Sequence, residues 1–226
     1  MISEMLSYDF IQRAFLGGVL VSLCAALLGV SLVLKRYSMI GDGLSHVSFG
    51  ALSIAIACGI APLKFAIPVV IVAAFLLLRL AENGKMRSDA AIAMVSASSL
   101  AIGVIVTSLT TGLSTDIYSY MFGSILAMSK DDVVVSGLLS VIVIIMFVAC
   151  YHKIFAVTFD ENFSKATGVK VGMYNTLISI FTAITIVVGI KMMGAMLISS
   201  LIVFPSLTSM RIFKSFKSVT ICSALL

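Results

Sequence analysis

The 226-residue sequence has no tryptophan, only three prolines and few charges. Asp, Glu, Lys and Arg make up 11% of the residues, whereas 61% are hydrophobic and the mean hydropathy is +1.19. A soluble domain could not cover its surface with so few polar side chains, so the composition excludes a water-soluble globular protein. We therefore predict an all-α integral membrane protein.

Several signatures of chemistry are also absent. The four cysteines are far apart and none is spaced as CxxC, which favours small reduced core residues over disulfides or a metal cluster. Neither the phosphate loop GxxxxGK[ST] nor the HExxH and GxSxG motifs of hydrolases occur. The chain has no visible means of hydrolysing ATP, so we do not predict an enzyme. An intramembrane hydrolase would lack a nucleophile or zinc motif.

Long apolar stretches recur along the whole chain, and a membrane-crossing helix needs about 20 mostly apolar residues. We predict seven complete spans and the start of an eighth, in one transmembrane domain over residues 1–226. The spans are 15–34, 44–60, 65–80, 90–109, 133–151, 173–190 and 192–210, followed by 219–226. Gly189 and Gly194 mark the turn expected between the last two complete spans.

The Lys and Arg residues indicate an orientation. If the connection after the first span is cytoplasmic, eleven of the 15 Lys and Arg residues lie inside and four lie outside. The positive-inside rule then favours an external N-terminus. The segment 112–132 lies outside in this topology, and its mixture of aromatic and apolar residues suits an interfacial or re-entrant segment.

Asp42 and His46 bring a carboxylate and an imidazole into sequence that is otherwise suited to lipid. Residues four apart share one face of a helix, so both side chains can point at one ion. This donor pair suits manganese, iron or zinc. The alternatives are that Asp42 is a helix N-cap and that His46 is a hydrogen-bonded core residue. Two donors do not complete a coordination shell; a second copy of the chain, water or backbone carbonyls could supply the others.

The connection 152–172 lies inside in this topology. Within it, residues 159–168 (FDENFSKATG) have the pattern of a short amphipathic helix that ends at a glycine. A soluble partner could dock there.

The motif around Asp42, residues 34–46 (LKRYSMIGDGLSH), resembles the signature of the membrane permeases of metal-ion ABC importers, the zinc, manganese and iron uptake family. Four later regions agree in order and spacing. They are residues 88–93 (SDAAIA), the outer segment 122–126 (FGSIL), the cytoplasmic coupling loop 159–169 and the span 194–209 around Pro205. Members of this family continue through further spans, so the resemblance implies spans beyond Leu226.

The resemblance implies a type II ABC importer permease in the bacterial cytoplasmic membrane. Its expected partners are a cytoplasmic ATPase, an extracytoplasmic metal-binding protein and a second permease copy in a homodimer. No cofactor is implied besides the transported metal. The metal ligands fall on Asp42 and His46, and the ATPase-coupling loop falls on Phe159, Asp160, Glu161, Ala166 and Gly168.

The rival hypothesis is a cation channel or a proton-coupled secondary carrier that works without an ATPase. It would predict acidic residues deep in several spans or an inverted repeat. The sequence offers neither beyond Asp42.

Overall fold

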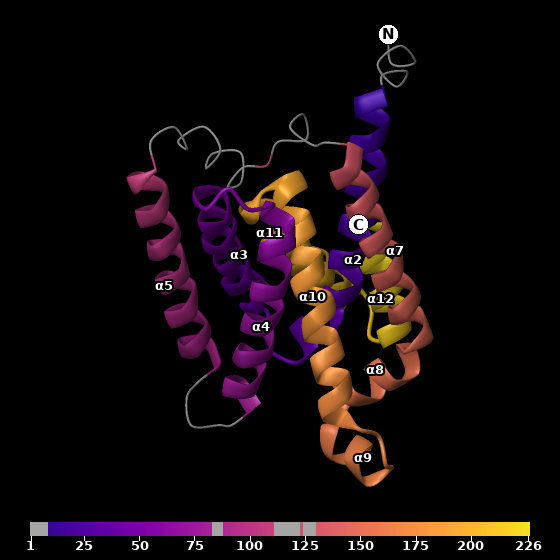
Figure 1. Ribbon diagram of the computed structural model, residues 1–226. Helices are drawn as coiled ribbons and strands as arrows, with labels where there is room; N and C mark the ends of the chain where they lie inside the picture. The colour runs from indigo at the N-terminus through magenta and orange to yellow at the C-terminus, as the bar shows by residue number, and fades with distance from the viewer. Residues whose placement is uncertain (1–8, 83–87, 111–122, 124–129) are drawn as a thin grey trace.

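A computed structural model of the chain describes residues 9–82, 88–110, 123 and 130–226 (Figure 1). These residues form α-helices joined by short turns and contain no strand. The helices are α2 (Asp9–Leu34), α3 (Ile40–Ala57), α4 (Pro62–Glu82), α5 (Ser88–Leu109), α7 (Lys130–Ala149), α8 (Tyr151–Phe159), α9 (Glu161–Ala166), α10 (Val171–Met193), α11 (Ala195–Ile212) and α12 (Phe216–Leu225).

Each predicted apolar segment lies in a helix, which confirms the all-α membrane fold, but the number of spans is not confirmed. Over the described residues, five helices are long and apolar enough to cross a membrane. A sixth would be the pair formed by α7 and α8, which is bent by 71°. The apolar part of α4 (Pro62–Leu77) and α12 are shorter than a bilayer requires.

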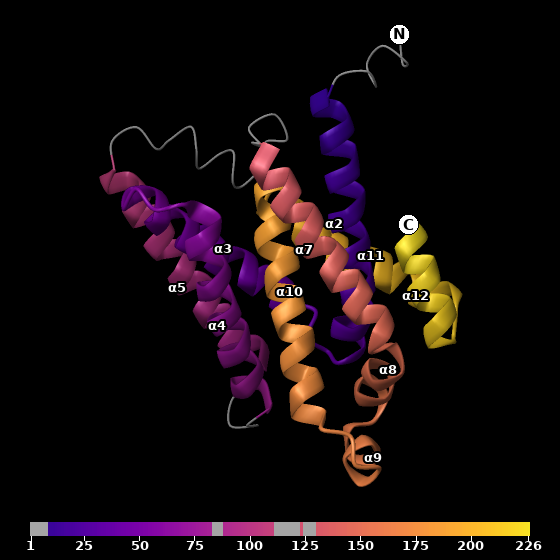
Figure 2. The same ribbon diagram turned by 45° about the vertical axis from the view of Figure 1, so that its right-hand side comes forward.

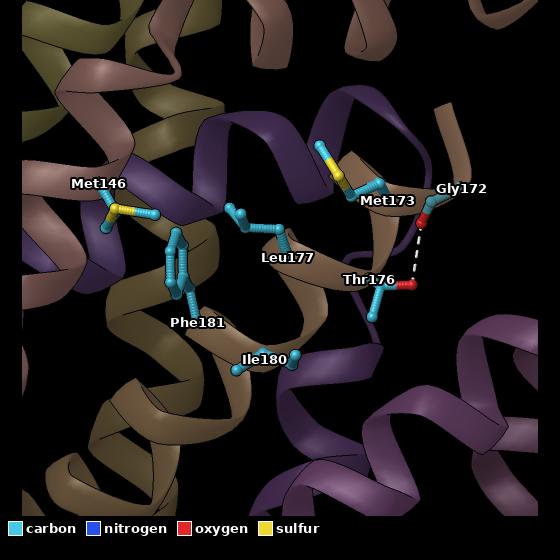
Figure 3. Close-up of a pocket in the computed structure, with 7 residues that line it drawn as sticks. All are labelled: Met146, Gly172, Met173, Thr176, Leu177, Ile180 and Phe181. Atoms are coloured by element: carbon cyan, nitrogen blue, oxygen red, sulfur yellow. Dashed lines mark hydrogen bonds between the residues drawn. The ribbon is translucent and has the colours of Figure 1, made fainter. Parts of the chain in front are cut away.

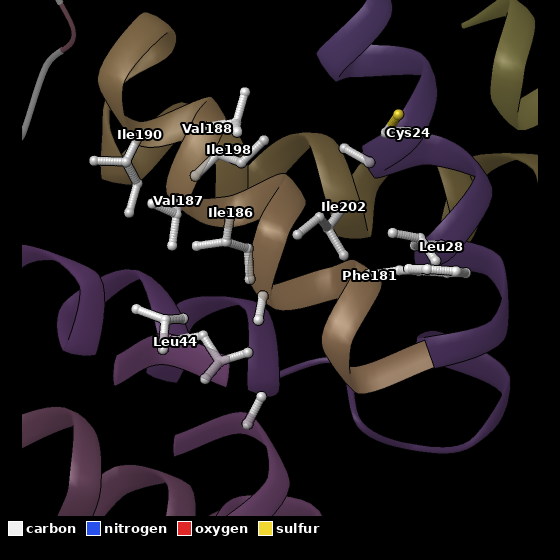
Figure 4. Packing of buried hydrophobic residues seen from close by; sticks show 14 of the residues in the cluster. Cys24, Leu28, Leu44, Phe181, Ile186, Val187, Val188, Ile190, Ile198 and Ile202 are labelled. Carbon is white, nitrogen blue, oxygen red and sulfur yellow. The ribbon is translucent and has the colours of Figure 1, made fainter. Parts of the chain in front are cut away.

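The core lies where α2, α3, α10 and α11 meet (Figure 4). Aliphatic side chains from all four helices fill it and are almost completely buried. They include Leu28, Leu44, Ile186, Ile190, Ile198 and Ile202. Since lipid tails are as apolar as these residues, such helices associate through close packing rather than through the hydrophobic effect.

The outer helices expose large apolar side chains. Ile102 and Ile105 of α5 are 50% and 57% exposed, and Ile145 and Val148 of α7 are 60% and 65% exposed. Figure 2 shows α5 at one edge of the bundle. An apolar exterior of this extent is the surface that a lipid-embedded protein presents, because water would not tolerate it.

The break between α10 and α11 is at Gly194, which has φ +85°, as predicted. Gly189, the other predicted turn residue, instead lies inside α10. There its missing side chain makes room for Ile198, whose Cδ1 atom would be 2.5 Å from a Cβ at this position. Close helix packing therefore explains Gly189.

Two contacts show which connections lie at the same end of the bundle. Lys35, directly after α2, pairs with Glu161 of α9, and Phe159 of α8 packs against Phe216 at the start of α12. Figures 1 and 2 place α9 at the opposite end from the start of α2. This arrangement agrees with the predicted topology. The segment 112–132 and the outer motif 122–126 lie outside the described residues, apart from Gly123 and the start of α7.

Candidate metal site and coupling helix

Asp42 and His46 lie one turn apart on the first half of α3, and their side chains meet. The Nε2 atom of His46 is 3.7 Å from the Oδ2 atom of Asp42. The His46 side chain is 27% exposed and that of Asp42 is 50% exposed, so both can reach an incoming ion. The structure thus brings together the two residues that the sequence selected as metal ligands.

The pair opens on a recess of about 40 Å³. One water molecule needs roughly 10–15 Å³, so the recess can hold an ion and a water. Leu100, near the middle of α5, contributes to the lining, so the recess lies partway along α5 rather than at its end. The other lining residues are Ser45, Phe49, Ala195 and Met196.

The glycines on either side of Asp42 let α3 fit between its neighbours. A Cβ on Gly43 would be 2.6 Å from Ile92 of α5, and a Cβ on Gly41 would be 3.3 Å from Ile202 of α11. The sequence Gly41-Asp42-Gly43 therefore positions the carboxylate by allowing both faces of the helix to pack closely.

The interpretation of Asp42 as a helix N-cap is wrong. The N-cap residue of α3 is Met39, without a side-chain cap bond, and Asp42 already belongs to the first turn. A carboxylate at this place is favoured by the helix dipole, but it satisfies no backbone group as a cap does. The side chain keeps its acceptor capacity for another partner.

Carboxylate and imidazole together suit borderline divalent metals. Among the described residues, no group of three or more His, Cys, Asp and Glu side chains comes together. Two hydroxyl groups are adjacent, since Ser199 of α11 donates to Ser45 at 3.4 Å. One chain therefore supplies two strong metal ligands, Asp42 and His46, and the weaker hydroxyl groups of Ser45 and Ser199 lie nearby.

A larger groove of about 420 Å³ between α7 and α10 has a different character (Figure 3). Figure 3 shows Met146 of α7 near Leu177 and Phe181 of α10. The hydroxyl of Thr176 already donates to the carbonyl of Gly172 at 2.8 Å. No lining residue titrates or carries charge, so this groove lacks the carboxylate and imidazole ligands that manganese, iron or zinc would need.

The predicted amphipathic helix of the coupling loop is α9, and both of its ends are capped. The Asp160 carboxylate accepts from the backbone N–H of Phe163 at 2.9 Å. At the other end Gly168 has φ +81°, its N–H donates to Lys165, and the N–H of Val169 donates to Ser164. This Schellman arrangement explains the glycine, because other residues are strained at positive φ.

The coupling-loop residues face two directions. Phe159, Phe163, Ala166 and Gly168 are exposed. Glu161 instead points back to the bundle, where it accepts from Lys35 at 2.8 Å and from Asn175 of α10 at 3.1 Å. Burial raises the pKa of Glu161, but these two hydrogen bonds and the charges of Lys35 and Lys165 outweigh it and lower the pKa below its ordinary value.

Sequence reasoning missed both partners of Glu161. Lys35 was interpreted only as a topology signal, yet its side chain is 6% exposed. Asn175 is a buried amide within an apolar run, at 3% exposure. The position of Asn175 within an apolar run is visible in the sequence and could have drawn attention to this residue, since a buried amide needs hydrogen-bond partners.

Comparison with known proteins agrees with this arrangement. The model of a family described as the ABC 3 transport family matches residues 7–226. A probable metal transport system membrane protein of Treponema pallidum is 35% identical over 92% of this chain and 78% of its own length. The high-affinity zinc uptake system membrane protein ZnuB of Buchnera aphidicola is 31% identical, over 89% of this chain and 78% of its own.

Among solved structures, PsaBC from Streptococcus pneumoniae in complex with Fab superposes with a TM-score of 0.86 at 26% identity. The match covers 100% of this chain and 82% of that one. The chain belongs to the ABC 3 transport family.

Proposed function

We propose that this chain is the permease subunit of an ATP-driven importer that carries a divalent transition metal across the bacterial cytoplasmic membrane. The observation that carries the proposal is the placement of Asp42 and His46 on one recess between α3, α5 and α11. Two relatives also support the proposal. They are the probable metal transport system membrane protein of Treponema pallidum and the zinc uptake protein ZnuB of Buchnera aphidicola. The family argues against the channel or secondary-carrier hypothesis.

In this mechanism Asp42 supplies an anionic oxygen and His46 a neutral nitrogen to the passing ion. An unpaired carboxylate inside a membrane protein is costly, and the metal charge offsets that cost. Water or a second permease copy completes the shell, the latter in a homodimer around a central path. Loose ligation suits transport, because the ion must also leave.

The metal reaches this path from an extracytoplasmic metal-binding protein and is driven by a cytoplasmic ATPase. The chain is not itself an enzyme, since ATP hydrolysis in this family belongs to a separate subunit. The surface offered to that subunit is α9, where Phe163 is 65% exposed and Phe159 is 61% exposed. Large apolar side chains at an aqueous end are typical anchors for a partner protein.

ATP binding and hydrolysis would move α9 and change the side to which the recess is open. Such alternating access needs contacts that differ between the two states. In the bilayer we propose seven complete spans and the start of an eighth, with α4 counted as a full span and α7 as the fifth, while α8 belongs to the cytoplasmic connection 152–172.

The test is metal uptake in a bacterial strain that lacks its own importers and expresses this chain with its cognate ATPase and binding protein. We expect uptake of manganese, zinc or iron to rescue growth. Competition among the three identifies the metal, because carboxylate and imidazole accept all of them.

Variants test the ligands. We expect Asp42→Asn and His46→Gln each to abolish uptake while the ATPase still copurifies. His152→Gln, which changes the other histidine of the chain at an exposed position on α8, is the matched control and should transport normally. Normal import by both ligand variants would refute the assignment.

A further inference from the structure

We propose that Lys35, Glu161 and Asn175 are positioning residues that transmit the movement of α9 to the Asp42–His46 recess. The inference deepens the proposed function and rests on it. It assigns to these three side chains the mechanical link between the ATPase-facing helix and the ion path.

The three side chains form a closed hydrogen-bonded cluster. The Lys35 ammonium donates to Glu161 Oε1 at 2.8 Å and also to the Asn175 side-chain oxygen. The Asn175 amide nitrogen donates to the same Glu161 oxygen at 3.1 Å. The residues come from the turn after α2, from α9 and from α10, so one cluster joins three separate parts of the chain.

Burial of Lys35 and Asn175 favours movement of this cluster as a unit, and the Glu161 side chain, which is 38% exposed, links it to α9. The Lys35 side chain is 6% exposed and Asn175 is 3% exposed. A buried ammonium that loses its carboxylate leaves an uncompensated charge, which is strongly unfavourable. The adjoining cavity is only about 10 Å³, too small for a water molecule to replace a lost partner comfortably. Displacement of Glu161 with α9 should therefore carry Lys35 and Asn175 along.

From Lys35 the chain leads directly to one wall of the recess. Backbone bonds hold the turn tightly: Tyr37 N–H donates to Leu32 at 2.8 Å and Ile40 N–H donates to Tyr37 at 3.0 Å. Seven residues after Lys35, Asp42 lies in the first turn of α3. A turn this short and well bonded transmits a shift rather than absorbing it.

Asn175 leads to other residues that line the recess. It lies near the start of α10, and at the far end of that helix the break at Gly194 is followed by Ala195 and Met196. These two residues line the same recess as Asp42 and His46. The cluster thus lies at the start of two chain segments that both lead to the recess, and its movement can change the shape of the recess.

The experiment measures coupling in proteoliposomes that contain the complete transporter with its ATPase and loaded binding protein. The readout is the number of metal ions imported per ATP hydrolysed, with ATPase copurification and thermal stability recorded for each variant. Lys35→Glu and Glu161→Lys should each lower this ratio on the order of tenfold, within the usual range of coupling between sites.

The double exchange, Lys35→Glu with Glu161→Lys, should restore much of the ratio. The Asn175 amide offers both a donor and an acceptor, so it can serve the exchanged pair after rotation. Lys214→Glu is the matched control: it reverses an exposed charge at the same end of the bundle, outside α9, that does not contribute to the electrostatics of Glu161, and it should leave the ratio unchanged.

If the single charge reversals fail to fold, Glu161→Gln keeps the test decisive, because it retains an acceptor and removes only the charge. A normal ratio in Glu161→Gln and in the foldable reversals, beside a wild type that imports metal, would overturn the inference and leave the proposed function intact. A wild type that imports no metal would refute the proposed function itself.

Discussion

Gly29 of α2 and Ile202 of α11 approach so closely that a Cβ on Gly29 would lie 1.9 Å from the Ile202 carbonyl oxygen. The obstructing atom belongs to the backbone, so no side-chain rotation can relieve the clash. We predict that Gly29→Ala forces the two helices apart and destabilises the fold by about 1–3 kcal/mol. Thermal unfolding of the protein in detergent measures the effect.

The control for that variant is Gly137→Ala in α7. A Cβ there would be 4.0 Å from its nearest neighbour, Leu20, which is ordinary contact. Both substitutions add one methyl group to a membrane helix, but only Gly29 lacks the space for it. Equal melting temperatures for the two variants would mean that the close approach of α2 and α11 is not important for stability.

The two glycines that flank the start of α10 provide a second matched pair. At both Gly168 and Gly172 an added Cβ would meet no atom within 4 Å, and only Gly168 has a positive φ. Gly168→Ala should therefore loosen the end of α9 at a cost of about 1–2 kcal/mol. Gly172→Ala should be neutral. Amide hydrogen exchange over residues 161–169 distinguishes them, and faster exchange in both variants would contradict the backbone argument.

The lowered pKa of Glu161 fixes the sign of a pH effect. A carboxyl whose pKa is lower in the folded state contributes stability above its unfolded pKa, and this stability is lost as the pH falls through the folded value. The attachment of α9 should therefore be constant from neutral pH down to about pH 5 and weaken only in stronger acid.

A spin label on the exposed position Asn162, in a variant with the native cysteines replaced, reports this attachment. Its mobility should rise in acid for the wild-type sequence. In Glu161→Gln the acid-dependent rise should be much smaller, because residue 161 no longer titrates. A mobility change centred near neutral pH would show that another group controls α9.

Much of the site could be predicted from the sequence because it is local. Asp42 and His46 are four residues apart, so helical periodicity alone places them on one face. The same holds for α9, whose Asp160 cap and Gly168 end lie within nine residues of each other. Apolar runs likewise revealed the helices, though not how many of them reach across a bilayer.

What escaped prediction depends on contacts between distant segments. The recess needs Leu100 and Met196, which are 54 and 150 residues from His46 and bear no polar group that would mark them. Lys35 and Glu161 are 126 residues apart, and single basic residues beside apolar runs are expected for topology alone. No short-range pattern distinguishes a buried lysine from a flanking one.

The orientation of the bundle can be tested with a native side chain. Cys58 at the end of α3 is exposed, whereas Cys24 is buried and Cys150 and Cys222 are only partly accessible. With the N-terminus outside, Cys58 faces the external solution, so a membrane-impermeant maleimide should label it in right-side-out vesicles. Cys58→Ser should abolish this labelling.

In the Cys58→Ser background, a cysteine placed by Lys214→Cys is exposed at the α9 end of the bundle and should react only after the vesicles are opened. The reverse pattern would invert the topology, and with it the side of the membrane from which α9 meets an ATPase.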